Sequence, residues 1–323
     1  MCVLHISVEN EAGGVPVNRT ESGLGDEAVT LRADRFLEAA IKHIAPLKGT
    51  HIYDAKLLDY QQKTSSPESG YGRWLQALLT HLKRFYISGH RLKILDFGCG
   101  TGELTVMMNH LGFDATGIDL HTEHLGLARI LANENGLPES IFVQSHGPKL
   151  PFDDNSFDVV TMFVVLEHLN DEVLDVILTE LRRVCHGVLY VLVPNKLQIR
   201  DDHTGLRFLP WMPRWLALLY LKTRGRRHQY CISEDGSWDV YYRGLRRIRK
   251  LFAVKGFEMD FIADEWVFPS LEKVPPITLI GKRIKIQGRW VPIGIPLPYR
   301  TLLRWGFPKQ VFYPYLNLVF VRR

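Results

Sequence analysis

The stretch ILDFGCGTGELT, residues 94–105, decides the fold of this chain. The apolar run at 92–97 predicts a short buried strand, and residues 101–110 predict the start of a helix. Between them lie three glycines at alternate positions: Gly98, Gly100 and Gly102. A glycine turn between a strand and a helix is typical of an α/β sheet that binds a ligand at that turn, and Asp96 places a carboxylate just ahead of it.

The chain beyond this turn alternates between predicted strands and helices. Strands are expected at 92–97, 113–119, 140–144, 157–163 and 187–194. The helix over Asn170–Cys185 has the clearest pattern, because Val173 and further apolar residues recur at helical spacing and Gly187 follows as the expected end. This alternation predicts a mostly parallel sheet with helices on both faces and a ligand beyond the carboxyl ends of the strands.

The remainder of the chain is less regular. Helices are expected at Ala33–Ile44 and Tyr71–Ile87, separated by the polar turn 61–70, and later at Val240–Lys255. Further strands are expected at Phe257–Asp264 and 315–323. The expected organisation is a loose lead-in over 1–30, a helical cap over 31–90, an α/β domain over 91–265 with an insertion at 195–238, and an extension over 266–323 that ends in the last strand.

Composition limits the classes of protein that this chain resembles. Its 323 residues are 46% hydrophobic and carry a formal net charge of +5, which is too mild to predict general affinity for nucleic acid. The four cysteines show no C-x-x-C pair, which fits a reducing compartment and argues against a zinc site. No basic leader and no uncharged apolar run of roughly 20 residues is present, so the sequence predicts a cytoplasmic protein.

The charge around the glycine turn distinguishes between two classes of ligand. A dinucleotide site needs a third glycine where Glu103 stands, and Asp96 would repel a pyrophosphate. S-adenosylmethionine carries ammonium and sulfonium groups, which suit a negative pocket. Asp119 follows Asp96 by 23 residues at the end of the second predicted strand, where a carboxylate accepts ribose hydroxyls. The residues therefore favour S-adenosylmethionine.

At this point the sequence resembles the class I S-adenosylmethionine-dependent methyltransferases, in particular the broad small-molecule group. The resemblance rests on LDFGCGTG, TGIDL and LPFDDNSFDVVTMFVVLEHL in the order of that family, and it covers about residues 70–265. It implies a Rossmann-like α/β fold with a seven-stranded, mostly parallel sheet whose last strand is antiparallel. It also implies methyl transfer, which we expect to go to oxygen, with nitrogen and carbon as less favoured acceptors.

The resemblance also assigns residues to the methyl donor. Asp96 and the glycines Gly98, Gly100 and Gly102 would surround its methionine end. Asp119 would bind the ribose, Leu120 would pack on the adenine, and the carbonyl near Met162 or Phe163 would meet the amino group. Arg73 would neutralise the donor carboxylate or lie on a solvated surface. The family usually has an aspartate where this chain has His146, followed by Gly147, so His146 would accept the bond from the adenine amino group.

Two groups of polar residues are candidates for catalysis. Glu167 and His168 follow the fourth predicted strand, and His168 is the leading candidate for a general base. The alternative is that both merely cap the next helix and hold the loop. Asp201, Asp202 and His203 follow the fifth strand, and His203 is either a base or a histidine that orients the insertion. No metal site is predicted, although Glu167 and His168 leave that possibility open.

The insertion bears on the acceptor. Residues 208–221 are apolar nearly all round, and residues 200–260 carry 13 Lys and Arg against 7 Asp and Glu. An apolar segment followed by basic residues is typical of an interfacial membrane element, here 208–227, and a lid helix over the site is the alternative. We therefore expect a small-molecule or lipid-linked acceptor and a cytoplasmic protein with possible peripheral contact with a membrane.

Three other functions stay open on the sequence. An RNA methyltransferase would use the basic surface at 200–260, but no RNA-binding module accompanies it. A non-catalytic protein that binds S-adenosylmethionine would explain His146. An oxidoreductase is disfavoured by Glu103. The acceptor and the oligomeric state do not follow from the sequence.

Overall fold

The computed structural model describes the following residues: 30–49, 51–65, 91–145, 147, 149–198, 201, 203–225, 239–262, 283–286, 289–292 and 315–323. Within these ranges the chain forms a seven-stranded sheet in the order β3-β2-β1-β4-β5-β9-β6. The strands are β1 Lys93–Phe97, β2 Asp114–Asp119, β3 Phe142–Gln144, β4 Phe157–Phe163, β5 Cys185–Pro194, β6 Phe257–Ile262 and β9 Tyr315–Arg322.

The last strand, β9, is antiparallel to both of its neighbours, β5 and β6, whereas β1 to β5 pair with one another in parallel. The predicted fold class, a mostly parallel seven-stranded sheet with an antiparallel last strand, is therefore confirmed. A separate antiparallel pair, β7 Arg283–Ile286 and β8 Arg289–Pro292, lies within the predicted C-terminal extension. The predicted boundaries between domains stay predictions.

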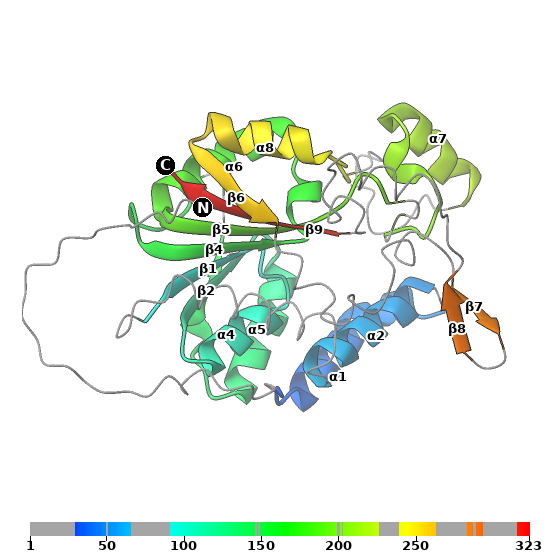
Figure 1. Ribbon diagram of the computed structural model, residues 1–323. Helices are drawn as coiled ribbons and strands as arrows, with labels where there is room; N and C mark the ends of the chain where they lie inside the picture. Colours follow the sequence, from blue (N-terminus) through cyan, green and yellow to red (C-terminus); the bar gives the residue numbers. More distant parts are fainter. Residues whose placement is uncertain are drawn as a thin grey trace, which may run out of the picture.

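Helices cover both faces of the sheet (Figure 1). One face carries α1 Asp34–Ile44, α2 His51–Ser65, α4 Glu103–His110 and α5 Thr122–Glu134. The other face carries α6 Asp171–Val184 and α8 Leu245–Val254, while α7 Arg214–Thr223 lies beyond one end of the strands. Four short 3-10 helices complete the described elements: η1 Ala45–Leu47, η2 Glu139–Ile141, η3 Leu166–His168 and η4 Leu209–Trp211. None of the described helices is both long and apolar enough to cross a membrane.

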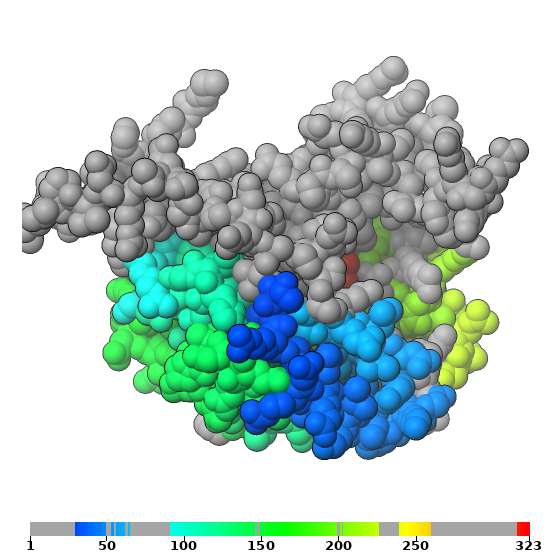
Figure 2. All heavy atoms as spheres, turned by 90° about the horizontal axis from the view of Figure 1, so that it is seen from below, coloured from blue at the N-terminus to red at the C-terminus, as the bar shows by residue number. Residues whose placement is uncertain are grey.

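On one face of the molecule, α1 packs beside α5 and α2 packs on α1 (Figure 2). The carboxylate of Glu134 accepts hydrogen bonds from the backbone N–H groups of Arg35 at 2.6 Å and Phe36 at 2.8 Å, which caps the start of α1. The predicted turn at 61–70 is wrong over its first half, because α2 continues to Ser65. The predicted helix at Tyr71–Ile87 lies outside the described residues.

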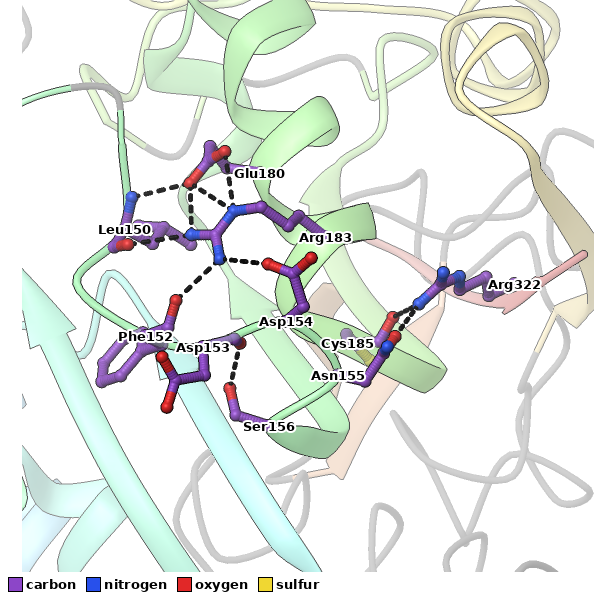
Figure 3. Close-up of polar contacts among 10 residues, drawn as sticks. All are labelled: Leu150, Phe152, Asp153, Asp154, Asn155, Ser156, Glu180, Arg183, Cys185 and Arg322. Atoms are coloured by element: carbon purple, nitrogen blue, oxygen red, sulfur yellow. Dashed lines mark hydrogen bonds and ion pairs between the residues drawn. The ribbon is translucent and has the colours of Figure 1, made fainter.

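The LPFDD motif forms a loop that Arg183 of α6 holds in place (Figure 3). The guanidinium of Arg183 donates to the carbonyls of Leu150 at 2.9 Å and Phe152 at 2.7 Å, and to the carboxylates of Asp154 and Glu180. These bonds raise the pKa of Arg183 above its ordinary value, with the bond to Glu180 as the largest cause. The motif that carried part of the family resemblance is thus a structural element that links β3 to β4.

Two local predictions around α6 are wrong. The helix passes directly into β5 at Cys185, so Gly187 does not end it. Gly187 lies inside β5, where an added Cβ would be 2.1 Å from the carbonyl oxygen of Asp158, so a close approach of two strands requires the glycine. Val173, expected to face inward, is 45% exposed.

The insertion also differs from the expectation of one apolar helix over 208–221. Pro210 lies in η4, and the chain begins a new helix only at Arg214, directly after Pro213. A proline is compatible with a helix start but not with a helix interior, which explains the break. The later helix begins at Leu245 instead of Val240, after Gly244.

Candidate active site

The glycine turn lies where β1 meets α4. Gly98, Gly100 and Gly102 all have positive φ, at 75°, 54° and 84°. A Cβ at Gly98 would lie 2.4 Å from Cγ2 of Val165, and one at Gly102 would lie 2.5 Å from Cζ of Phe142. Gly98 and Gly102 therefore let the turn pack against its neighbours, whereas a Cβ at Gly100 would meet nothing within 4 Å.

Asp96 lies beneath this turn and is buried. Its carboxylate accepts hydrogen bonds from the hydroxyls of Thr105 at 2.7 Å and Thr161 at 2.8 Å. Burial raises the pKa of Asp96 to about 6, against the effect of these two hydroxyls, and the negative charges of Asp119 and Glu103 raise it further. Glu103 is itself buried and accepts a bond from Thr101. Three carboxylates thus make the surroundings of the turn negative.

Asp119 ends β2 beside the same turn. One carboxylate oxygen accepts the backbone N–H of Gly100 at 2.9 Å, and the other accepts that of His121 at 2.9 Å. Leu120, the next residue, is 64% exposed. A carboxylate held in place by two backbone groups and followed by an exposed apolar side chain fits the predicted contacts with a ribose and an adenine.

Phe163 ends β4 and is buried, and the chain turns directly after it. Val164 has a φ of 59°, a conformation that β-branched residues rarely adopt. Strain of this kind costs of the order of 1 to 3 kcal/mol and persists only where the surroundings impose it. The strained residue separates Phe163 from Val165, which packs against Gly98.

Two of the predicted donor contacts cannot be placed. Arg73 and His146 both lie outside the described residues. Gly147 is exposed, and its carbonyl accepts a hydrogen bond from the hydroxyl of Ser145 at 3.1 Å. The assignments of Arg73, His146 and Gly147 therefore stay predictions.

The candidate catalytic residues Glu167, His168 and His203 come together, although they follow different strands. Each offers one ligand atom, and these atoms lie within 4.8 Å of one another. The rings of His168 and His203 meet edge to face, with centroids 5.4 Å apart. Glu167 is fully buried, which raises the pKa of its carboxyl. Asp202 lies outside the described residues.

Carboxylates lie behind both histidines. Nδ1 of His168 is 3.5 Å from Oδ2 of Asp239, and Nδ1 of His203 is 3.5 Å from Oδ1 of Asp201. Asp201 is buried, which opposes its ionisation, but bonds from His203, Thr204 and Tyr242 hold its pKa below the ordinary value. Hydrogen bonds from the hydroxyls of Thr204 and Tyr242 fix this carboxylate.

Neither Glu167 nor His168 caps the helix that follows, which was the alternative explanation for both. The cap of α6 is Asn170, whose side chain accepts the backbone N–H of Val173 at 2.8 Å. The pair instead occupies η3, one turn before the cap. Their position is therefore not explained by the needs of α6.

Sequence reasoning did not single out Arg243. Arg243 is 5% exposed, and its guanidinium donates to the carbonyls of Leu166 and Leu169 and to the carboxylate of Asp171. These bonds hold both ends of η3. The only local signal is that Gly244 separates Arg243 from the exposed arginines of the helix.

Comparison with known proteins agrees with this geometry. Residues 94–187 match the model of a family described as a methyltransferase domain. The chain is 43% identical over 82 residues to a ubiquinone biosynthesis O-methyltransferase of Photorhabdus laumondii, which is 24% of this chain and 33% of that protein. It is 29% identical over 156 residues to an uncharacterized methyltransferase of Synechocystis sp., covering 43% of this chain and 68% of the relative.

A third relative is a ubiquinone/menaquinone biosynthesis C-methyltransferase of Shewanella sp., 33% identical over 120 residues, covering 35% of this chain and 47% of that protein. This chain thus spans about a third to a half of the length of the two quinone-pathway relatives. The matched segment contains the glycine turn, β1 to β4 and the Glu167–His168 pair. The sheet order and the matched segment, residues 94–187, identify a methyltransferase domain of the class I S-adenosylmethionine-dependent fold within this chain.

Proposed function

We propose that this protein transfers a methyl group from S-adenosylmethionine to an oxygen atom of a small or lipid-linked acceptor. The observation that carries the proposal is the negative glycine turn, where Asp96, Glu103 and Asp119 lie close enough for their charges to affect one another. A negative pocket disfavours the pyrophosphate of a dinucleotide and favours a cationic nucleoside. S-adenosylmethionine supplies, when bound, an electrophilic methyl group on a sulfonium.

The residues of the turn have separate tasks in this proposal. Gly98 and Gly102 let the backbone approach its neighbours closely, so the ligand lies against backbone and not against side chains. Asp119 would hold the ribose, with its orientation fixed by the N–H groups of Gly100 and His121. The exposed face of Leu120 would be covered by the adenine. Orientation of this kind can supply several kcal/mol of the barrier to an in-line transfer.

The acceptor would approach the cluster of Glu167, His168 and His203. A hydroxyl acceptor must lose its proton as it takes the methyl group, and a histidine whose Nδ1 faces a carboxylate can accept that proton at its other nitrogen. His203 has such a partner in Asp201. The two quinone-pathway relatives are named as enzymes that methylate oxygen or carbon, which supports an aromatic hydroxyl compound as the acceptor class.

Incubation of cell extracts with the protein and isotope-labelled S-adenosylmethionine tests the activity and identifies the acceptor. We expect one product with the mass gain of a single labelled methyl group on oxygen. A His203→Asn variant should reduce its formation about 10²- to 10⁴-fold, the usual contribution of a general base. No labelled product in any extract, with the donor bound, would indicate a non-catalytic binding protein instead.

The affinity for S-adenosylmethionine should depend on pH through Asp96. A cationic ligand favours the ionised carboxylate, so binding should weaken as the pH falls through about 6, the pKa of Asp96 without ligand. If the protonated form does not bind, the affinity falls about tenfold between pH 7 and pH 5. Calorimetry at several pH values measures this dependence.

Two variants separate Asp96 from the other titrating candidate, His146. The pH dependence should persist in His146→Gln and should disappear in Asp96→Asn, whose side chain has no charge to lose. A wild-type affinity that stays constant from pH 5 to pH 7, or binding of NAD in place of the nucleoside, would contradict the proposed role of the negative turn.

We further propose that the outer face of α7 contacts a membrane surface. Ala217 and Leu221 of this helix are buried against the insertion, whereas Trp215 is 69% and Leu219 52% exposed. Three more exposed apolar side chains come from the preceding segment: Leu197, Phe208 and Trp211. Basic residues flank these side chains, which suits an anionic lipid surface.

A groove of about 290 Å³ opens beside this apolar surface, lined by Lys196, Leu197, Trp211 and Gly244. Three lining residues, Lys196, Leu197 and Trp211, come from the segment after β5 that also carries Asp201. The fourth, Gly244, directly follows Arg243. The guanidinium of Arg214 at the start of α7 stacks on the ring of Tyr241, 4.1 Å from its centroid, which ties the helix to the second of these segments. A lipid-linked acceptor could therefore extend from a membrane surface along this groove toward the cluster.

Co-sedimentation with phosphatidylglycerol vesicles tests the membrane contact. Replacing Trp215 and Leu219 together by serine should weaken binding at least tenfold, because each large apolar side chain contributes about 1.5 to 3 kcal/mol when it leaves water. The matched control is Val254→Ser on α8, since Val254 is 72% exposed but lies on another helix. Absence of vesicle binding by the wild type would leave α7 as a lid helix.

A further inference from the structure

We propose that Glu167, His168 and His203 form a binding site for a divalent transition-metal cation. The three residues each place a potential ligand atom within 4.8 Å of the other two. A cation between three such atoms would lie about 2.0 to 2.2 Å from each, which spacings of this size permit after small side-chain rotations. Glu167 and His168 share one turn, η3, and His203 reaches them from the insertion after β5.

Glu167 is the strongest indication of a cation site. Its side chain is fully buried, and neither carboxylate oxygen has a hydrogen-bond partner among the described residues. The nearby guanidinium of Arg243 does not supply one, because it donates to Asp171 and to the backbone carbonyls of Leu166 and Leu169. A buried carboxylate without a donor or a counter-ion is costly, and a bound cation would remove that cost.

The carboxylates behind both histidines are the second indication. Asp239 faces Nδ1 of His168 and Asp201 faces Nδ1 of His203, each at 3.5 Å. A histidine that binds a metal usually directs its other ring nitrogen toward a carboxylate or a carbonyl, which fixes the orientation of the ring. The two carboxylates are thus placed to orient the rings that offer ligand atoms within 4.8 Å of the Glu167 carboxylate. Asp201 is in turn held by the backbone N–H of Thr204 at 2.6 Å.

The ligand types indicate which cations the site would take. Two imidazoles and one carboxylate suit zinc, cobalt, manganese and ferrous iron better than calcium or magnesium, which prefer oxygen ligands alone. Three protein ligands also leave coordination positions open. An acceptor hydroxyl in one of these positions would lose its proton more readily. Water at the rim of the site would then take that proton in place of His203, which would hold the cation. This role rests on the proposed methyl transfer, but the cation site itself does not.

Binding of the metal alone tests the site. Protein stripped with a chelator should bind one equivalent of Co²⁺ or Zn²⁺ by calorimetry, and Co²⁺ should give a visible absorption spectrum. Glu167→Gln and His203→Asn should each weaken binding at least about 100-fold. The matched control is His186→Asn, because His186 also pairs with a carboxylate, at 3.1 Å from Asp158, but on β5 away from the cluster. This control should bind the metal like the wild type.

Thermal unfolding provides a readout that does not require activity. Added Zn²⁺ should raise the Tm of the wild type and of His186→Asn, but not that of Glu167→Gln, even if this variant is more stable without metal. Failure of the stripped wild type to bind any of the four cations would overturn the inference, as would equal binding by His203→Asn. Full methyl transfer by metal-free protein would overturn the catalytic role of the cation and leave the proposed function intact, with His203 as the base.

Discussion

Replacing Arg243 by alanine is expected to lower the free energy of unfolding by about 3 kcal/mol. The side chain is 5% exposed and donates to the carbonyls of Leu166 and Leu169 and to Asp171. Its loss would take the side-chain donor from the carbonyl of Leu169 and leave the carbonyl of Leu166 with only the backbone N–H of Leu169, at 3.4 Å. An unsatisfied buried group costs about 1 to 3 kcal/mol. Urea unfolding followed by circular dichroism measures the change.

The same substitution should also reduce methyl transfer at temperatures where the protein stays folded. Glu167 and His168 lie on η3, so a loosened turn would misplace them relative to His203. A displacement of about 1 Å can cost of the order of 100-fold in rate. The affinity for S-adenosylmethionine should change little, because Arg243 has no bond to the glycine turn.

Arg247→Ala is the matched control for Arg243. Arg247 also pairs with Asp171, at 2.7 Å, but its side chain is 51% exposed and it makes no bond to η3. An exposed pair of this kind contributes about 0 to 1 kcal/mol. Equal destabilisation by the two substitutions would show that the ion pair with Asp171 accounts for the lost free energy of unfolding. The hydrogen bonds from Arg243 to the carbonyls of Leu166 and Leu169 would then contribute little.

Replacing Gly98 by alanine is expected to lower the affinity for S-adenosylmethionine at least tenfold and to destabilise the fold by about 2 to 4 kcal/mol. The positive φ of 75° costs a residue with a Cβ about 1 to 2 kcal/mol. In addition, the new Cβ would lie 2.4 Å from Cγ2 of Val165, so either the turn or the start of η3 must move. Calorimetry and urea unfolding measure the two effects.

Two further variants separate these causes. Gly126→Ala lies within α5, where the added Cβ meets nothing within 4 Å, so it should stabilise the protein by about 0.5 to 1 kcal/mol. Val165→Ala combined with Gly98→Ala removes the side-chain collision but not the backbone strain, so it should recover only part of the loss. Unchanged donor affinity in Gly98→Ala would contradict the assignment of the turn to the methyl donor.

The parts of this protein that the sequence predicted are those fixed by local physics. The glycine turn, the strand at 157–163 and the helix at Asn170–Cys185 appear within a residue or two of their predicted bounds, because hydrophobic periodicity and turn chemistry act between near neighbours. The antiparallel last strand was predicted from the family resemblance. Asp119 could be placed because a residue at the end of a parallel strand necessarily lies at the ligand edge of the sheet.

Two of the errors arose where distant residues decide the conformation. In α2, Thr64 is buried and its hydroxyl donates to the carbonyl of Tyr60, whose ring packs on Phe36, so tertiary packing extends a helix through residues that favour a turn. At the end of α6, Gly187 serves the close approach of two strands instead of a helix end. Composition alone gives no sign of either contact.

By itself, the sequence determined the alternating strands and helices around the glycine turn, the turn itself and the negative charge beside it, because each follows from local patterns of residues. Only the tertiary structure decided that Arg243 is buried against η3 and that His203, after β5, lies beside Glu167 and His168, after β4. The physical reason is that burial and the pairing of charges depend on which segments meet in space, and the paths of the loops between the strands determine that meeting.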